Sequence, residues 1–171
     1  FSLIERKRTI ALENAVLEGE DHCVILGHPG AGKTTSLKKI CDLIITEKSN
    51  STYTFPILLR FRDLGHINTD TPILDHISNI IQFEFNFEDK KETQFNFGIV
   101  HAKEEAIFSF LNYIKPILVL DGFDELKDEK TKQIIVNELL KLSKKLTKCN
   151  FVLSCRTGEF NYELDHTNTY E

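Results

Sequence analysis

The sequence contains no methionine and no tryptophan, and its four cysteines form no Cys-x-x-Cys pair. Such pairs are typical of structural zinc sites and of redox-active disulfides. Cys23, Cys41, Cys149 and Cys155 lie within apolar stretches instead. We interpret them as free buried thiols in a reducing compartment, in preference to a disulfide or a metal site, and we expect a cytoplasmic protein.

Long apolar runs are also missing: none comes near the roughly 18–20 residues that cross a bilayer, and no signal-peptide pattern is present. We therefore expect no membrane partner. The net charge of −5 lacks the basic excess of proteins that coat nucleic acids, so we expect no direct nucleic-acid partner, although local basic patches stay possible. The 171 residues are 41% hydrophobic and 27% charged, which indicates one globular domain over 1–171. Because the chain starts with Phe1, we expect a fragment or processed product.

Strand and helix patterns alternate along the chain. Compact apolar runs predict buried strands at 23–26, 55–61, 117–121 and 151–155. Helical spacing predicts a short leading helix within 1–20 and helices from 33 to about 47, after Thr71-Pro72, around 102–111, and over 129–146 with Asp128 as N-cap. Between Phe83 and Phe97 a β-hairpin and a partly helical segment fit equally. This order predicts an α/β fold, a parallel sheet with helices on both faces.

A glycine-rich loop follows the first predicted strand and matches the Walker A pattern Gly-x-x-x-x-Gly-Lys-Thr. Glycines let successive backbone N–H groups point at phosphate oxygens, and the following helix adds its N-terminus. Lys33 is expected to reach the β- and γ-phosphates and Thr34 to ligate Mg²⁺. The alternative, a glycine-rich turn without a ligand, does not explain the flanking strand and helix. The predicted nucleotide-binding residues are Gly27, His28, Pro29, Gly30, Ala31, Gly32, Lys33, Thr34 and Thr35.

An acidic segment ends the strand predicted at 117–121. Asp121 follows four apolar residues, which is the Walker B arrangement, and is predicted to hold Mg²⁺. Asp124 and Glu125 follow closely, and a carboxylate there could orient the attacking water. A solvated acidic loop that caps the next helix is the alternative.

Arginines follow two other predicted strands. Arg156 comes after the last one and would face the γ-phosphate if that strand lies between the Walker A and Walker B strands; a surface arginine is the alternative. Arg60 and Arg62 alternate on one side of the strand at 55–61. For these two we favour an ion pair with Asp63 or a helix end over a catalytic role.

Together these residues resemble a NACHT domain of the STAND class of P-loop NTPases, most closely in bacterial members. The resemblance covers about residues 10–170 and lies in the Walker A loop, Leu120–Leu126, Leu58–Leu64 and the segment from Cys155 to Tyr162. Gly122 matches the small residue that follows the metal-binding aspartate in this family. The resemblance implies five parallel strands, with the Arg156 strand beside the Walker A strand.

The resemblance also implies a function: a switch that binds ATP or GTP with Mg²⁺, hydrolyses it slowly, and exchanges ADP for ATP to allow self-association. Attached sensor and effector domains would carry the signal, in innate immunity in animals and antiphage defence in bacteria. The predicted catalytic residues are Lys33, Asp124, Glu125 and Arg156. The fifth strand could begin only around 169–171, and the family's helical and winged-helix lid has no counterpart in these residues, so we expect weak turnover.

Other classes remain as alternatives. One is a nucleotide-dependent oligomerisation module with negligible turnover, which shares every motif. Another is a P-loop kinase or a DNA-processing ATPase. A kinase usually lacks the carboxylate cluster at 121–125, and a DNA motor should carry a basic stripe that the acidic balance opposes.

Overall fold

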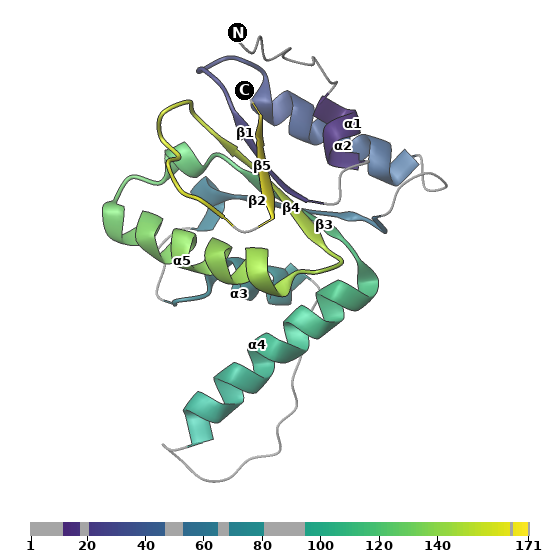
Figure 1. Cartoon of the computed structure of the whole chain (residues 1–171). Helices are drawn as coiled ribbons and strands as arrows, with labels where there is room; N and C mark the ends of the chain where they lie inside the picture. The colour runs from purple at the N-terminus through teal and green to yellow at the C-terminus, as the bar shows by residue number, and fades with distance from the viewer. Residues whose placement is uncertain are drawn as a thin grey trace, which may run out of the picture.

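Among the residues that the structure describes, five parallel strands form the centre of the fold (Figure 1). The computed structural model describes residues 12–17, 21–46, 53–64, 69–80, 95–164 and 166–170. The strands are β1 (His22–Leu26), β2 (Pro56–Arg60), β3 (Ile117–Asp121), β4 (Asn150–Cys155) and β5 (Thr167–Tyr170). Their order is β2-β3-β4-β1-β5. This confirms the predicted α/β class and places the strand before Arg156 between the other two site-bearing strands.

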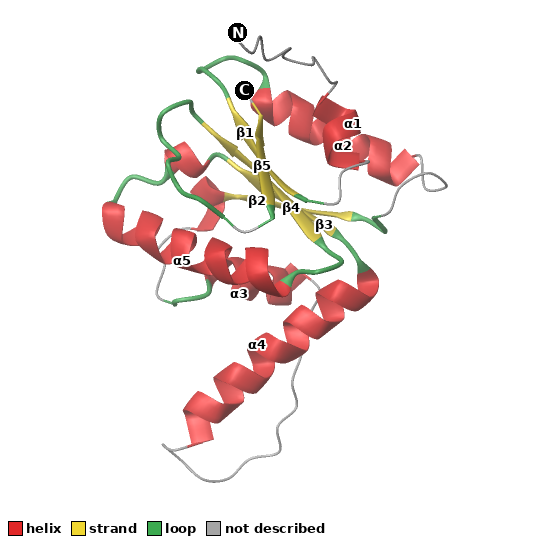
Figure 2. Ribbon diagram, viewed as in Figure 1, coloured by secondary structure: helices red, strands yellow, loops and turns green. Residues whose placement is uncertain are grey.

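Helices cover both faces of the sheet (Figure 2). The short α1 (Leu12–Leu17) and α2 (Lys33–Thr46) lie on one face. The opposite face carries α3 (Pro72–Ile80), α5 (Glu129–Lys145) and the C-terminal part of α4 (Phe95–Ile114). Two 3-10 turns, η1 (Phe61–Leu64) and η2 (Phe123–Glu125), follow β2 and β3. Within the described ranges, no helix is both long enough and apolar enough to span a membrane.

The strands are apolar throughout because each contributes to two cores. Successive side chains of a strand point to opposite faces. Ile117 and Val119 of β3 pack toward α1 and α2, whereas Leu118 and Leu120 pack toward α3 and α5. On β4, Val152 lies with the first group, and Phe151 and Leu153 with the second. By the same alternation Asp121, the last residue of β3, points toward the start of α2.

Three boundaries differ from the sequence predictions. β2 ends at Arg60 and the chain turns into η1, so the strand alternation expected to place Arg60 and Arg62 on one side does not hold. β5 begins at Thr167, earlier than expected, because its pairing with β1 starts at His22–Thr167. α4 already begins at Phe95, inside the ambiguous segment. Residues 1–11 and 18–20 of the predicted leading segment, and 81–94, lie outside the described residues.

One buried carboxylate, that of Glu138, joins two helices that are distant in sequence. Pro72 begins α3 as predicted, but the cap that sequence reasoning missed is Glu138 of α5, which accepts from the N–H groups of Ile73 and Leu74 at 2.8 Å each. These bonds satisfy donors that a helix N-terminus otherwise leaves unpaired. Burial raises the pKa of Glu138 to about 8, against the lowering effect of the two N–H groups.

Acid is expected to destabilise the fold through His22. Its ring stacks on Phe151, accepts from the Phe151 N–H at 3.3 Å and lies 3.4 Å from the Ser143 carbonyl oxygen. Burial lowers the pKa of His22 from 6.5 to about 4, so the folded state favours the neutral ring. The contribution of neutral His22 to the free energy of unfolding is therefore complete above pH 6.5. It is lost as the pH falls toward 4, in total about 3 kcal/mol.

The measurement is the free energy of unfolding by urea at several pH values, compared with the His22→Gln variant. Gln keeps a donor and an acceptor but does not titrate in this range. The difference between the two proteins should shrink as the pH falls. Parallel pH curves for wild type and His22→Gln would show that His22 does not carry this dependence.

Candidate functional site

The loop between β1 and α2 has the conformation that its glycines allow. Gly30 and Gly32 have φ angles of +79° and +85°. No heavy atom lies within 4 Å of a Cβ built on either glycine, so backbone conformation rather than space requires glycine at both positions. Lys33, the first residue of α2, donates from Nζ to the carbonyl oxygens of Gly27 at 2.6 Å and His28 at 3.2 Å. Its ammonium group therefore lies across the loop that precedes α2.

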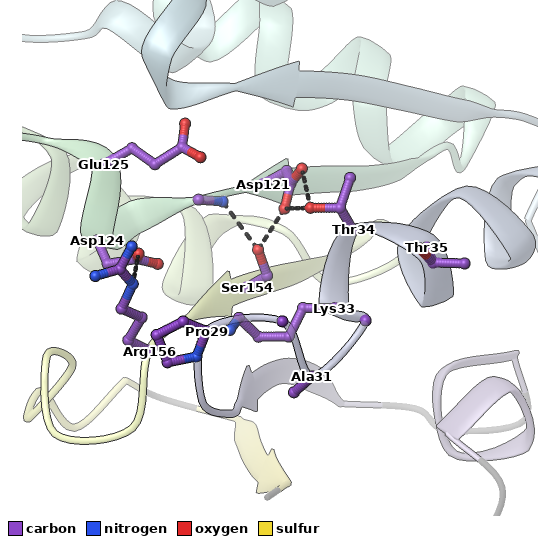
Figure 3. A pocket seen from close by; sticks show the side chains of 13 residues that line it. Pro29, Ala31, Lys33, Thr34, Thr35, Asp121, Asp124, Glu125, Ser154 and Arg156 are labelled. Carbon is purple, nitrogen blue, oxygen red and sulfur yellow. Dashed lines mark hydrogen bonds and ion pairs between the residues drawn. The ribbon is translucent and has the colours of Figure 1, made fainter.

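Asp121 and Thr34 lie together at the carboxyl end of the sheet (Figure 3). Thr34 Oγ1 is 3.0 and 3.2 Å from the two Asp121 carboxylate oxygens. A hydroxyl and a carboxylate are the hard oxygen ligands that Mg²⁺ prefers, and Mg²⁺ usually takes few protein ligands beside phosphates and water. These two residues therefore fit the predicted ion. Among the described residues, no group of three or more His, Cys, Asp and Glu side chains could hold a metal.

Ser154 of β4 is the site residue that sequence reasoning missed. Its buried hydroxyl donates to Asp121 Oδ1 at 2.6 Å and accepts from the Gly122 N–H at 2.9 Å. The strand alternation could have indicated it, because Ser154 lies two residues after Val152, which packs on the α2 side of the sheet. A polar residue on that face, at the end of a strand next to the Asp121 strand, has Asp121 within reach.

Asp124 and Glu125 have different surroundings. The Asp124 carboxylate pairs with Arg156 Nε at 2.7 Å, and only 8% of its side chain is exposed against 52% of that of Arg156. Glu125 is exposed, and its side chain folds back over Gly122. A Cβ built on that glycine would lie only 3.0 Å from Glu125 Cδ. The two carboxylates are therefore not equivalent: one holds an arginine, and the other lies beside the residue that follows Asp121.

An aromatic cluster, formed by Phe61, Phe123, Phe160 and Tyr162, holds the turns that carry these groups. Phe123 of η2 makes edge-to-face contacts with the other three rings at centroid distances of 5.2 to 6.1 Å. Such contacts stabilise a pair beyond its simple burial. The cluster joins η1, the η2 turn that carries Asp124 and Glu125, and the loop that follows Arg156.

One cavity of about 390 Å³ brings most of the predicted residues together. It is lined by Pro29, Gly30, Ala31, Gly32, Lys33, Thr34, Thr35, Asp121, Gly122, Asp124, Glu125, Ser154 and Arg156 (Figure 3). Gly27 and His28 do not line it, and their carbonyl groups bind Lys33 instead. Arg60 and Arg62 also lie outside its lining and are within 4.0 and 3.8 Å of Asp63, in line with the predicted ion pair.

Replacing Gly122 with alanine is expected to cost stability and to disturb Glu125. Gly122 has φ +81°, a left-handed conformation that costs a non-glycine residue about 1–2 kcal/mol. The new Cβ would also push the Glu125 side chain away from its position, since it would lie 3.0 Å from Cδ. Urea unfolding measures the first effect, and the rate of nucleoside triphosphate hydrolysis measures the second.

Gly158→Ala is the matched control. Gly158 has φ +84°, but nothing lies within 4 Å of a Cβ built on it. Both variants should lose similar stability, whereas only Gly122→Ala should lose hydrolysis beyond that. Equal rates of hydrolysis in the two variants would contradict the expectation that displacing Glu125 slows hydrolysis.

Two solved structures have folds similar to that of this chain. The fold is similar to that of the Orc1 protein of Aeropyrum pernix, solved in complex with DNA, with a TM-score of 0.54 and 18% identity; the match covers 84% of this chain and 35% of that one. A dimeric post-hydrolysis state of the ATP-binding cassette MJ0796, bound to ADP and Pi, matches with a TM-score of 0.40 and 14% identity over 81% of this chain and 76% of that one. No curated protein sequence matches the chain.

The chain thus spans about a third of the length of Orc1, and at such identities the likeness concerns the fold alone. A protein-family model also matches the chain, and this match is one of sequence and not of fold. The NACHT domain model matches residues 21–167, which include β1, the glycine-rich loop, Asp121, Arg156 and the first residue of β5. This chain therefore belongs to the NACHT domain family and is a nucleotide-binding module of the P-loop NTPase fold.

Proposed function

We propose that this chain is the nucleotide-operated switch of a STAND-class signalling protein, which binds ATP in preference to GTP and hydrolyses it slowly. The observation that carries the proposal is that three separate segments of the chain line the same cavity, with Lys33, Thr34, Asp121, Glu125 and Arg156. Phosphoryl transfer needs positioning and charge stabilisation more than covalent chemistry. This cavity offers cations, metal ligands and a carboxylate side by side.

Each residue has a proposed part. Lys33 and the N–H groups at the start of α2 bind the β- and γ-phosphates. Thr34 and Asp121 hold Mg²⁺, which when bound neutralises phosphate charge. Glu125 orients and polarises the attacking water, and Arg156 contacts the γ-phosphate.

The ion pair between Arg156 and Asp124 supports a switch rather than a fast enzyme. The γ-phosphate must compete with Asp124 for the guanidinium group, so a triphosphate and a diphosphate favour different positions of Arg156. The Arg156 side chain is also 52% exposed, and solvent weakens the charge stabilisation that it offers. Both features support slow turnover.

The wider role rests on the family resemblance. We propose a cytoplasmic protein that acts in bacterial defence, antiviral innate immunity or regulatory signalling through attached sensor and effector domains and self-association. The four free cysteines support a reducing compartment. With a net charge of −5 we propose no direct nucleic-acid partner, and stimulation of hydrolysis by DNA would contradict this.

The test combines calorimetric binding of ATP, GTP and ADP with phosphate release, each with Mg²⁺ and with EDTA. We expect binding that Mg²⁺ strengthens, a preference for ATP, and slow phosphate release. Binding without any phosphate release would favour the second candidate, a nucleotide-dependent oligomerisation module. The ion pair between Arg156 and Asp124 also favours this candidate, because it holds the arginine away from a γ-phosphate. No nucleotide binding at all would overturn both.

A further inference from the structure

Ser154 makes one hydrogen bond to the proposed metal ligand Asp121 and another to the backbone of the next residue, Gly122. Its hydroxyl oxygen accepts from the Gly122 N–H at 2.9 Å, and its proton goes to Asp121 Oδ1 at 2.6 Å (Figure 3). Only 1% of the residue is exposed, so water does not compete for either bond. A hydroxyl has one proton, and this arrangement directs it at the carboxylate.

The short bond is of the charge-assisted kind, in which a carboxylate accepts from a hydroxyl. Thr34 Oγ1 approaches both Asp121 oxygens from the start of α2. Ser154 holds Oδ1 from the β4 side. Two hydroxyl groups from two different elements therefore fix the plane of this carboxylate.

Ser154 also holds the backbone at the point where the chain leaves β3. The Gly122 N–H belongs to the residue with φ +81° that turns the chain toward Asp124 and Glu125. One side chain thus fixes both the Asp121 carboxylate and the start of the turn after it. A serine needed only to satisfy its own buried hydroxyl would require one partner rather than these two.

We propose that Ser154 is a positioning residue that sets the affinity of the site for its divalent cation through Asp121. This inference rests on the proposed function. Mg²⁺ demands nearly ideal octahedral geometry, so a ligand free to rotate binds it less well. Loss of such an outer partner of a metal ligand typically lowers metal affinity 10- to 100-fold.

The experiment measures ADP binding by calorimetry, with MgCl₂ and with EDTA, for wild type and Ser154→Ala. Removing the hydroxyl should weaken Mg²⁺-dependent binding by at least about tenfold and leave binding in EDTA within about twofold. Titration of the ADP complex with Mn²⁺, with free Mn²⁺ counted by electron paramagnetic resonance, reads metal affinity directly. Equal metal affinity in the two proteins, or equal weakening with and without metal, would overturn the inference.

Two further variants guard against a folding defect. Ser154→Cys keeps the volume but donates weakly, so it should lose metal affinity as alanine does, and wild-type metal affinity in this variant would count against Ser154. Ser143→Ala is the matched control: Ser143 is a buried serine of α5 that bonds the Leu140 carbonyl oxygen, and its loss should not change metal affinity. If Ser143→Ala lowered metal affinity as much, the effect would be general destabilisation and the inference would fall.

Wild type separates this inference from the proposed function. If wild type bound ADP neither with Mg²⁺ nor in EDTA, the proposed function would fail and the inference with it. If wild type bound Mg²⁺ and ADP but the Ser154 variants matched it, only the role of Ser154 would be wrong.

Discussion

Replacing Lys33 with alanine is expected to weaken ATP binding by about 100-fold, which corresponds to about 2.7 kcal/mol. A hydrogen bond to a charged group contributes about 1.5–3 kcal/mol, so the loss of one ammonium group that binds phosphate accounts for this figure. Lys33 has a second role, because its Nζ also binds the carbonyl groups of Gly27 and His28 within the loop. Alanine removes the charge and these loop contacts together.

Calorimetric titration with ATP and Mg²⁺ measures the effect. Lys33→Met keeps most of the length of the side chain without its charge and should bind as weakly as Lys33→Ala. Lys38→Ala is the matched control, since Lys38 is exposed one turn further along α2 and carries the same charge. Wild-type affinity in Lys33→Ala, or an equal loss in Lys38→Ala, would show that the site does not bind phosphate through Lys33.

Replacing Glu125 with glutamine is expected to slow hydrolysis by about 100-fold or more, which is the usual contribution of a general base. Glutamine keeps the shape of the side chain and removes its ability to accept a proton. The exposed Glu125 carboxylate lies beside Gly122 and lines the same cavity as Lys33 and Asp121. ATP affinity should stay within about threefold of wild type, since the proposed phosphate contacts are made by other residues.

Asp124→Asn provides the contrast, because Asp124 is engaged by Arg156 at 2.7 Å. Without that ion pair the guanidinium group is available to a γ-phosphate, so we expect affinity for ATP to rise several-fold relative to ADP. Single-turnover phosphate release and paired ATP and ADP titrations separate the two variants. If Asp124→Asn abolished hydrolysis while Glu125→Gln did not, the assignment of the two carboxylates would have to be reversed.

Much of the fold could be predicted because its evidence is local. The apolar runs at the centres of β1, β3 and β4 are continuous in sequence, because helices cover both faces of the sheet and the strands bury almost every side chain. Ser154, near the end of β4, is a polar residue within such a run. The glycine-rich loop and Asp121 were found for the same reason, since each motif lies within a few consecutive residues. The predicted N-cap Asp128 was also confirmed, and it accepts from Thr131 only three residues away.

Element ends were predicted less well, since long-range contacts set them. β2 was expected to continue to Phe61, but the backbone enters η1 at this residue. The buried Phe61 ring packs on Phe123. β5 was expected later, but its start is set by pairing with β1. No pattern within either segment contains this information.

The sequence by itself determined the class of the protein and most of the residues proposed for its site: the loop from Gly27 to Thr34, Asp121 and the acidic pair after it. Only the tertiary structure decided how these groups are paired. Ser154 reaches Asp121 across 33 residues, Glu138 caps α3 across 65, and Asp124 pairs with Arg156. The physical reason is that residue type and spacing specify which chemistry a segment offers, whereas a hydrogen bond or an ion pair between segments depends on strand order and register.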